Sequence, residues 1–201
     1  MNMNNRTNKT YIVFINLPND ISSFIEGIIK EVSPKSTQKL KPHITIKYDE
    51  DLLAEESKIV DVVGKFVSNL SSFKVRLGKM QINESNLGFN VYIQVQPRKK
   101  IVNIVHNISK LIEPFIDPNS PEAFKSTKWE QSDKFYPHIS IKGTSDRISA
   151  KKILNKANEY HKNYKNEFTL KSITLARWNK DRWKKVESFK LKADKKPSDI
   201  G

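Results

Sequence analysis

Two copies of one short motif carry the residues of this chain that are best suited to chemistry. The sequence reads KPHITIK at residues 41–47 and YPHISIK at residues 136–142. Each copy places a hydroxyl residue two positions after a histidine, as His43 with Thr45 and His138 with Ser140. An imidazole can accept or donate a proton near neutral pH, and a hydroxyl can donate a hydrogen bond to a charged oxygen. These groups are suited to acid–base chemistry on a phosphodiester.

Both copies are predicted to form strands. Successive side chains of a strand alternate between its two faces, so His43, Thr45 and Lys47 are predicted to share one face opposite Ile44 and Ile46. The second copy repeats this pattern with His138, Ser140 and Lys142 opposite Ile139 and Ile141. A proline directly before each histidine fits the first residue of a strand, or an edge strand, better than a strand interior.

The repetition favours function over chance. A single His-x-Thr in a half-buried strand would most simply be structural, because so short a motif arises often. Here the two copies agree at six positions, lie far apart, and use two of only four histidines. The other two, His106 and His161, fall in or near predicted helices and are interpreted as structural or surface residues.

The paired motifs resemble those of the two-histidine (2H) phosphoesterase superfamily, which includes 2′,5′ RNA ligase-like proteins and cyclic nucleotide phosphodiesterases. That family carries two His-x-Thr/Ser motifs, one in each half of a pseudo-symmetric α+β domain. The order of elements from about Tyr11 to Leu191 is also similar to the family's. The resemblance implies that the two motif histidines face each other across a central groove. The catalytic residues that it implies are His43, Thr45, His138 and Ser140.

Hydrophobic spacing predicts an α+β fold, with two antiparallel sheets flanking a groove and helices on the outside. Strands are predicted at residues 11–17, 43–48, 73–82, 88–95, 138–142, 168–178 and 183–191. Helices are predicted at residues 19–32, 51–69, 98–115 and 145–163. The pattern restarts after Pro97, which predicts two lobes.

The predicted lobes comprise residues 10–97 and 98–192, and the termini, residues 1–9 and 193–201, are predicted to be disordered. Between the third helix and the second motif, residues 117–131 are predicted to form a long loop that could act as a lid or contact a substrate.

Composition narrows the class of protein. A net charge of +14 over 201 residues favours an anionic ligand such as RNA, an oligonucleotide or a cyclic nucleotide. The absence of cysteine excludes disulfides and thiolate metal sites. No apolar run reaches the length of a signal peptide or a membrane span. We therefore expect a cytoplasmic monomer with no membrane partner.

Metal binding is the competing role for histidines. Neither motif carries a second histidine or a carboxylate two or four positions on along the same strand face, so no metal site is predicted. Asp49 and Glu50, just after the first motif, are interpreted as a solvated turn. Two-histidine acid–base chemistry requires no metal or other cofactor.

Basic and aromatic residues near the motifs and in a late hairpin indicate substrate contacts. Residues 175–184 read LARWNKDRWK, a mixture that stacks bases and holds phosphates. The alternative is a hairpin whose tryptophans cover a sheet edge, and we favour it for Trp183. The predicted substrate-binding residues are Lys47, Lys142, Tyr48, Tyr136, Arg177 and Trp178.

These observations predict a metal-independent phosphodiesterase. The family resemblance implies a 2′-linked bond, either a 2′,3′-cyclic phosphate or a 2′-5′ linkage. Three alternatives stay open: hydrolysis of cyclic nucleotide or oligonucleotide immune signals, as some phage and viral members of the family perform, 2′-5′ RNA ligation, and RNA binding without chemistry. Because both motifs offer the same groups, the sequence does not indicate which histidine is the acid and which the base.

Overall fold

The computed structural model describes residues 10–34, 40–49, 52–85, 88–120, 128, 130, 132, 135–160 and 166–193. Residues 1–9 and 194–201, in the two termini predicted to be disordered, lie outside this described part. Residues 121–127, 129 and 131 of the predicted 117–131 loop also lie outside it.

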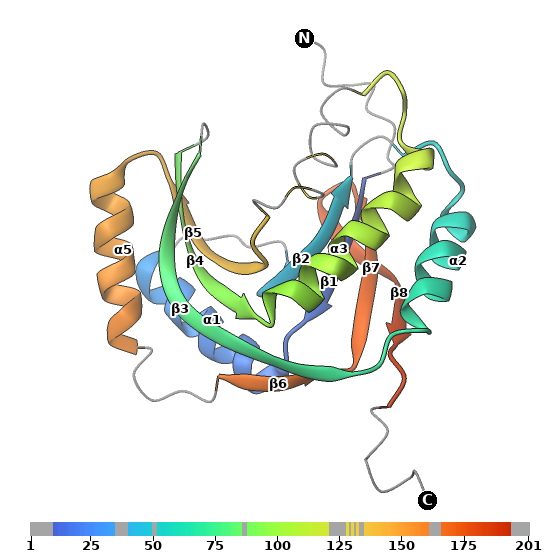
Figure 1. Ribbon diagram of the computed structural model, residues 1–201. Helices are drawn as coiled ribbons and strands as arrows, with labels where there is room; N and C mark the ends of the chain where they lie inside the picture. The colour runs from blue at the N-terminus through green and yellow to red at the C-terminus, as the bar shows by residue number, and fades with distance from the viewer. Residues whose placement is uncertain are drawn as a thin grey trace, which may run out of the picture.

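Two four-stranded antiparallel sheets form the framework of the described residues, which confirms the predicted α+β fold (Figure 1). The first sheet has the order β2-β1-β7-β8, with β1 at Tyr11–Asn16, β2 at His43–Asp49, β7 at Ser172–Asn179 and β8 at Arg182–Lys190. The second has the order β5-β4-β3-β6, with β3 at Phe73–Ser85, β4 at Gly88–Gln96, β5 at His138–Thr144 and β6 at Glu167–Leu170. Both motif strands, β2 and β5, are edge strands, as the prolines before them predict.

Two of the helices contact the sheet other than the one whose strand they follow. The helices are α1 at Asn19–Val32, α2 at Glu56–Val67, α3 at Arg98–Ile112 and α5 at Arg147–Tyr160, and a 3₁₀ turn at Glu113–Phe115 follows α3. The helix α1 follows a strand of the first sheet but contacts β5 of the second, whereas α3 follows a strand of the second sheet and contacts β2 of the first. Most buried apolar residues of both sheets and of the four helices form one core cluster, whereas Ile12, Phe14 and Ala176 of the first sheet form a second, smaller cluster.

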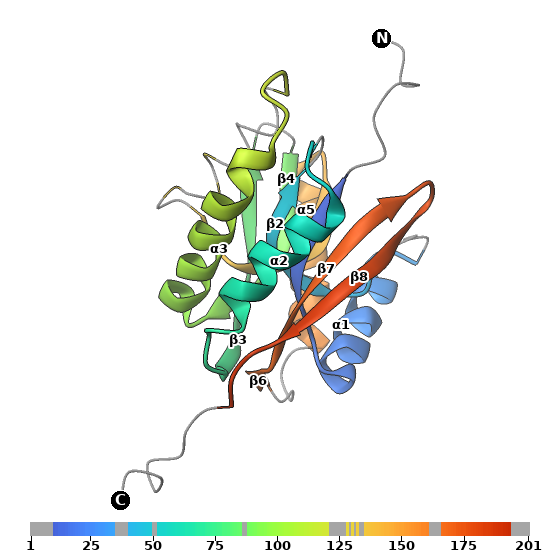
Figure 2. The same cartoon turned by 90° about the vertical axis from the view of Figure 1, so that its right-hand side faces the viewer.

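The two sheets do not correspond to the two halves of the chain. The predicted strand at 168–178 ends and restarts at Lys171, so that β6 joins the second sheet and β7 joins the first. The hairpin of β7 and β8 runs along one side of the molecule (Figure 2) and completes the sheet that β1 and β2 begin. The predicted lobes, 10–97 and 98–192, therefore do not coincide with the sheets.

The strand β2 contains a bulge directly after its hydroxyl residue. Phe14 pairs with Thr45 and Val13 pairs with Lys47, which leaves Ile46 as an extra residue. A bulge of this kind reverses the alternation of side chains that follow it. Lys47 is therefore only 1% exposed, and the prediction that it shares the open face with the histidine is wrong.

The strand β5 contains a bulge at the equivalent position. Tyr92 pairs with Ser140 and Val91 pairs with Lys142, which leaves Ile141 as the extra residue. This register turns Lys142 toward the face opposite Ser140, where it is half-buried. The same irregularity in both motif strands thus turns both motif lysines off the faces that carry the histidines.

None of the helices in the described ranges is long and apolar enough to cross a membrane.

Two glycine substitutions test the tight contact between β4 and β5. Gly88 has φ of +110°, and a Cβ there would lie 2.6 Å from the carbonyl oxygen of Thr144. We expect Gly88→Ala to lower the free energy of unfolding by about 1–3 kcal/mol. Gly27, exposed in α1, is the matched control because a Cβ added there would meet nothing within 4 Å. Gly27→Ala should raise the free energy of unfolding by about 0.5–1 kcal/mol. Both variants are measured by urea unfolding, and equal changes in the free energy of unfolding would contradict this account.

Candidate active site

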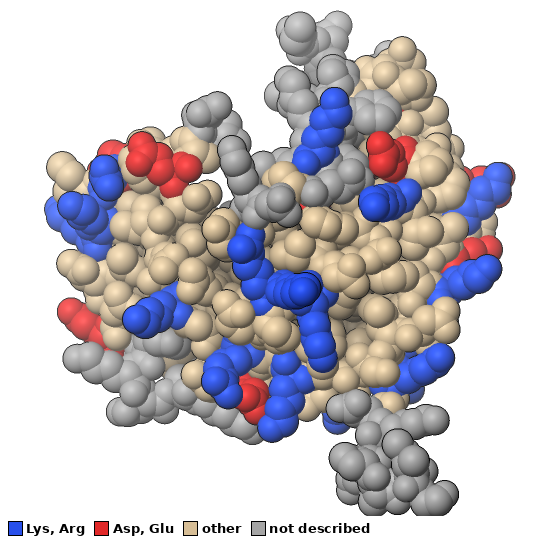
Figure 3. Space-filling model, in the orientation of Figure 1, with Lys and Arg blue, Asp and Glu red and all other residues tan. Residues whose placement is uncertain are grey.

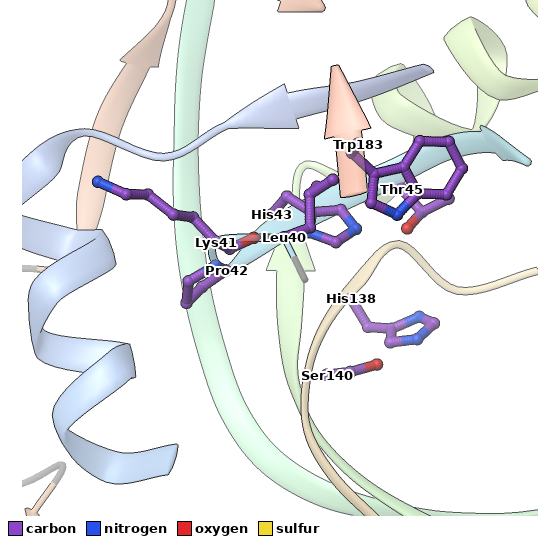
Figure 4. A pocket seen from close by; sticks show the side chains of 8 residues that line it. All are labelled: Leu40, Lys41, Pro42, His43, Thr45, His138, Ser140 and Trp183. Carbon is purple, nitrogen blue, oxygen red and sulfur yellow. Dashed lines mark hydrogen bonds between the residues drawn. The ribbon is translucent and has the colours of Figure 1, made fainter. Parts of the chain in front are cut away.

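The two motifs meet at a cavity of about 260 Å³, here called the catalytic cavity. It lies where the edge strands β2 and β5 approach each other. His43, Thr45, His138 and Ser140 line it, and Leu40, Lys41, Pro42 and Trp183 complete the wall. Figure 4 shows both imidazoles directed to the same side, whereas the ammonium of Lys41 points away from them. The structure therefore brings together all four residues of the predicted catalytic set.

Each motif histidine is oriented by a backbone carbonyl two residues earlier. His43 Nδ1 lies 2.8 Å from the carbonyl oxygen of Lys41, and His138 Nδ1 lies 2.7 Å from that of Tyr136. Since a carbonyl oxygen only accepts, Nδ1 carries the hydrogen in each ring and Nε2 is the proton acceptor of the neutral imidazole. The intervening proline fixes its own φ and keeps the preceding residue extended, which presets this geometry.

An aromatic ring on the neighbouring strand supports each imidazole in the same way. Phe14 meets His43 edge to face with centroids 5.3 Å apart, and Tyr92 meets His138 at the same 5.3 Å. The interplanar angles are 67° and 68°. With one hydrogen bond and one ring contact each, the two histidines have nearly equivalent surroundings, which preserves the pseudo-symmetry of the motifs.

Burial lowers the pKa of both histidines below their ordinary value of 6.5. For His43, the nearby charge of His138 lowers the pKa further. Because both pKa values lie below 6.5, both rings are mostly neutral near pH 7. The state with one protonated and one neutral imidazole, which an acid and base acting together require, is stabilised by a nearby negative charge such as that of a phosphate.

The hydroxyl of Ser140 has a partner that the sequence interpretation missed. Asn90 Nδ2 on β4 donates a hydrogen bond of 3.1 Å to Ser140 Oγ. This bond occupies a lone pair of the oxygen, so the hydroxyl hydrogen of Ser140 is available for another acceptor. The signal was present in the sequence, because Asn90 is an amide within a strand of mostly apolar residues.

Lys47 lies in a buried charge cluster outside the catalytic cavity. Its Nζ is 2.7 Å from Asp49 and 2.7 Å from Glu130. Glu130 Oε2 also accepts from Ser109 Oγ on α3 at 3.2 Å, and Oε1 accepts from the backbone N–H of Tyr48 at 3.4 Å. The cluster therefore ties β2 to α3 and to residue 130.

One expectation about this region is corrected, and one buried residue was not predicted. Asp49, predicted to lie in a solvated turn, is 2% exposed because the bulge turns it inward with Lys47. Glu130, within the predicted 117–131 loop, is buried, and burial raises its pKa to about 7 although Lys47 opposes the shift. Nothing in the local pattern marked Glu130, since its partners are distant in sequence.

The aromatic residues of the β7–β8 hairpin reach the cavity differently from the prediction. Trp183 lines the cavity, whereas Trp178 contacts Trp183 with ring centroids 5.3 Å apart. Tyr48 also contacts Trp183, at 6.0 Å, and is 38% exposed on the open face. Arg177 pairs with Glu56 at 3.1 Å. Trp183 packs on Ile12, Phe14 and Ala176 of the first sheet, in line with the favoured interpretation, and it also lines the cavity.

The remaining histidine of the described chain, His106, lies on α3 and outside the catalytic cavity. Tyr136, the residue before the second motif proline, lines a neighbouring cavity that His138 also lines.

Within the described ranges, no group of three or more His, Asp or Glu residues is placed to hold a metal ion.

The coupling between the histidines can be measured directly. We expect NMR titration of the imidazole protons to give pKa values below 6.5 for both His43 and His138. His138→Gln should raise the pKa of His43, because it removes the opposing charge while leaving the cavity filled. A pKa of His43 that stays the same or falls in this variant would contradict coupling.

The buried carboxylate predicts a pH dependence of stability. The folded protein holds a proton on Glu130 up to about pH 7, whereas the unfolded chain releases it near 4.5. Between these values the folded state binds more protons, so the contribution of Glu130 to the free energy of unfolding falls as the pH rises. Glu130→Gln should remove that decline, on the order of 1–3 kcal/mol across the window.

The free energy of unfolding of wild type and of Glu130→Gln is measured by urea unfolding at several pH values, and the difference between the two proteins is followed with pH. This difference is needed because the lowered pKa values of the two histidines act with the opposite sign. Glu159→Gln, at an exposed carboxylate on α5, is the control and should leave the pH dependence unchanged. A difference for Glu130→Gln that does not vary between pH 4.5 and 7 would contradict the raised pKa.

Solved structures share this fold. The crystal structure of TT0787 from Thermus thermophilus matches with a TM-score of 0.62 and 12% identity, over 92% of this chain and 100% of that chain. The structure of E. coli LigT complexed with NADP+ matches with a TM-score of 0.58 and 14% identity, over 91% and 98% of the respective chains. A phosphoesterase matches with a TM-score of 0.56 and 12% identity, over 92% and 99%. At these identities the likeness concerns the fold.

Sequence comparison supplies the family. No curated protein sequence matches the chain significantly. The sequence profile of the 2′-5′ RNA ligase superfamily matches residues 17–182, which include both motifs, the whole second sheet, and β2 and β7 of the first sheet. The chain with the two facing histidine motifs therefore belongs to the 2′-5′ RNA ligase superfamily, within the 2H phosphoesterase group.

Proposed function

We propose that this protein is a metal-independent phosphodiesterase that hydrolyses a 2′-linked phosphodiester, either a 2′,3′-cyclic phosphate or a 2′-5′ linkage. The observation that carries the proposal is the catalytic cavity, where two oriented imidazoles and two hydroxyls line one space. A pair of histidines in this arrangement can supply both proton transfers of the reaction.

The steps follow from the groups in the cavity. The neutral histidine accepts a proton at Nε2 from the attacking water, whose oxygen forms a bond to phosphorus. The protonated histidine donates its Nε2 proton to the leaving ribose oxygen as the bond between phosphorus and that oxygen breaks. Thr45 and Ser140 donate hydrogen bonds to the non-bridging oxygens, where negative charge accumulates.

Charge stabilisation in this mechanism comes mainly from the imidazolium and the hydroxyls. Lys47 is paired with two carboxylates in the core, and the ammonium of Lys41 points away from the histidines (Figure 4). Because the singly protonated pair carries one positive charge, an anionic substrate stabilises that state and raises the pKa of the protonated imidazole. The net charge of +14 adds long-range attraction for a polyanion.

The aromatic cluster beside the cavity supports a nucleotide substrate. Trp183 lines the wall, and Tyr48 and Trp178 pack against its ring, so a flat indole is held next to the histidines. Stacking of a base on such a ring is worth about 1–3 kcal/mol. E. coli LigT, which shares the fold, has been solved with NADP+, 3′-AMP and ATP, and this agrees with a nucleotide ligand here.

The ligase alternative uses the same residues in the reverse direction. Joining requires a second RNA end to be held where water would otherwise attack, so hydrolysis is the simpler proposal. Hydrolysis of cyclic nucleotide or oligonucleotide signals is a narrower form of the same reaction. An RNA-binding protein without chemistry would keep its affinity for RNA when both histidines are replaced, with strong salt dependence.

Turnover of a substrate panel tests the proposal. The panel contains 2′,3′-cyclic mononucleotides, 2′-5′ oligoadenylate, 3′-5′ RNA and cyclic dinucleotides, all assayed in EDTA. We expect hydrolysis of a 2′-linked substrate, with kcat/KM reduced by about 10²–10⁴ in His43→Ala and in His138→Ala, because each removes a proton-transfer group.

His106→Ala is the matched control, because it removes a histidine outside the cavity and should leave turnover unchanged. Thermal unfolding of each variant establishes that the fold is retained. Turnover that survives both motif substitutions, or the absence of turnover on every substrate in wild type, would refute the proposed function.

A further inference from the structure

The face of the second sheet that carries His138 extends beyond the catalytic cavity. Tyr92 supports the ring of His138, and its hydroxyl donates to Gln81 Oε1 on β3 at 3.2 Å. Gln94, the direct partner of His138 across β4 and β5, donates to the same oxygen at 2.9 Å. A molecule held at His138 therefore meets a row of amide groups when it continues across this sheet face.

The same sheet face continues to two basic residues of β3. Gln96 lies two residues after Gln94 and shares its face, and Arg76 is its direct partner on β3. Lys74, two residues before Arg76, also shares this face, and the two basic side chains are 76% and 65% exposed. Strand spacing and rise place Arg76 about 12 Å and Lys74 about 16 Å from His138.

Further basic residues join this face from the start of α3. The backbone N–H of Arg98 donates to the side chain of Gln96 at 3.0 Å, which ties the first turn of α3 to the sheet face. The guanidinium of Arg98 lies 4.0 Å from the ring centroid of Tyr136, beside the second motif. Lys100 Nζ lies 5.3 Å from the ring centroid of Phe73, at the start of β3. The basic side chains at the start of α3 therefore lie close to those of β3.

These neighbouring cations form a continuous surface, here called the basic strip. Its members are Lys74, Arg76, Lys79, Arg98, Lys99 and Lys100. Figure 3 shows basic side chains gathered in the middle of the front face, over the start of α3, and below it. Glu167 pairs with Lys74 at 2.9 Å and with Arg76 at 3.2 Å, which holds both side chains in place and leaves the strip with a clear excess of positive charge.

We propose that the basic strip binds the phosphate backbone of a single-stranded RNA whose terminal 2′-linked phosphodiester lies in the catalytic cavity. Closely spaced cations on an open face suit the successive phosphates of a flexible chain. The amides of Gln81 and Gln94, between the strip and His138, can donate to and accept from a ribose 2′-hydroxyl.

The inference rests on the proposed function, because the phosphodiester at the histidines sets where the chain begins. It narrows the substrate to the end of an RNA. A mononucleotide has one phosphate, which lies at the histidines, and places no charge on the strip.

Binding of product-like RNA tests the strip without requiring turnover. The probe is a fluorescently labelled single-stranded RNA of about ten nucleotides that ends in a 2′-phosphate, followed by anisotropy. Uridine 2′-monophosphate, followed by isothermal titration, is the short reference. At low salt, wild type should bind the RNA at least about tenfold more tightly than the mononucleotide, and its affinity for the RNA should fall steeply with salt.

The double variant Lys74→Gln/Lys100→Gln removes two cations of the strip. It should weaken RNA binding by about 10–100-fold at low salt and reduce the slope of log affinity against log salt by about 1.4, because each phosphate contact on a single strand contributes about 0.7. Its affinity for uridine 2′-monophosphate should equal that of wild type, which also shows that the fold is retained.

The matched control is Lys151→Gln/Lys152→Gln. These exposed lysines lie on α5, which packs against the opposite face of the same sheet, so RNA affinity and salt slope should stay as in wild type. RNA that binds no more tightly than the mononucleotide, wild-type RNA affinity in the strip variant, or an equal loss in the α5 variant would each overturn the strip.

The two proposals fail in different ways. Turnover of 2′,3′-cyclic mononucleotides, with no effect of chain length on binding, would leave the phosphodiesterase proposal standing and overturn the strip. Length-dependent binding that is lost in the strip variant, in a protein that turns over no substrate, would have the reverse meaning.

Discussion

The chemistry of this protein depends on one interaction made twice, the hydrogen bond from a histidine Nδ1 to the carbonyl oxygen two residues earlier. It fixes the tautomer, so that Nε2 is the atom offered to a substrate. The proline between donor and acceptor makes the bond local, since it restricts its own backbone and that of the preceding residue. The rest of the fold has only to bring two such turns together, which the facing edge strands β2 and β5 achieve.

The bulges that follow both motifs explain why the cavity is lined by histidine and hydroxyl groups without the motif lysines. In each strand an extra isoleucine reverses the alternation after the hydroxyl residue. Lys47 is thereby buried against two carboxylates, where it neutralises charge in the core. An ammonium beside the histidines would lower their pKa values further and disfavour the protonated acid. The bulge thus keeps the ammonium of Lys47 out of the catalytic cavity, where a protonated imidazole supplies the positive charge.

Sequence reasoning succeeded where the information was local. Strand and helix periodicity located most of the elements, and the duplicated motif located His43, Thr45, His138 and Ser140 in one cavity. It failed where the answer depended on pairing between distant segments. Nothing at Lys171 indicates that the chain leaves one sheet for the other, and a bulge is invisible to a simple period of two. The burial of Glu130 likewise depends on Lys47 and Ser109, which precede it by many residues.

The two halves of the site differ most just beyond the histidines. The imidazoles have matching carbonyl and ring contacts, but Asn90 holds Ser140 and has no equivalent beside Thr45 among the described residues, because Ile12 occupies the corresponding place on β1. On the side of His43 the neighbouring surface is the indole of Trp183, whereas on the side of His138 it is a polar hairpin end. Symmetric catalytic groups can exchange the roles of acid and base, so they alone cannot orient a substrate. The unequal surroundings can orient a substrate, because the groups on the two sides of its phosphodiester would contact different residues.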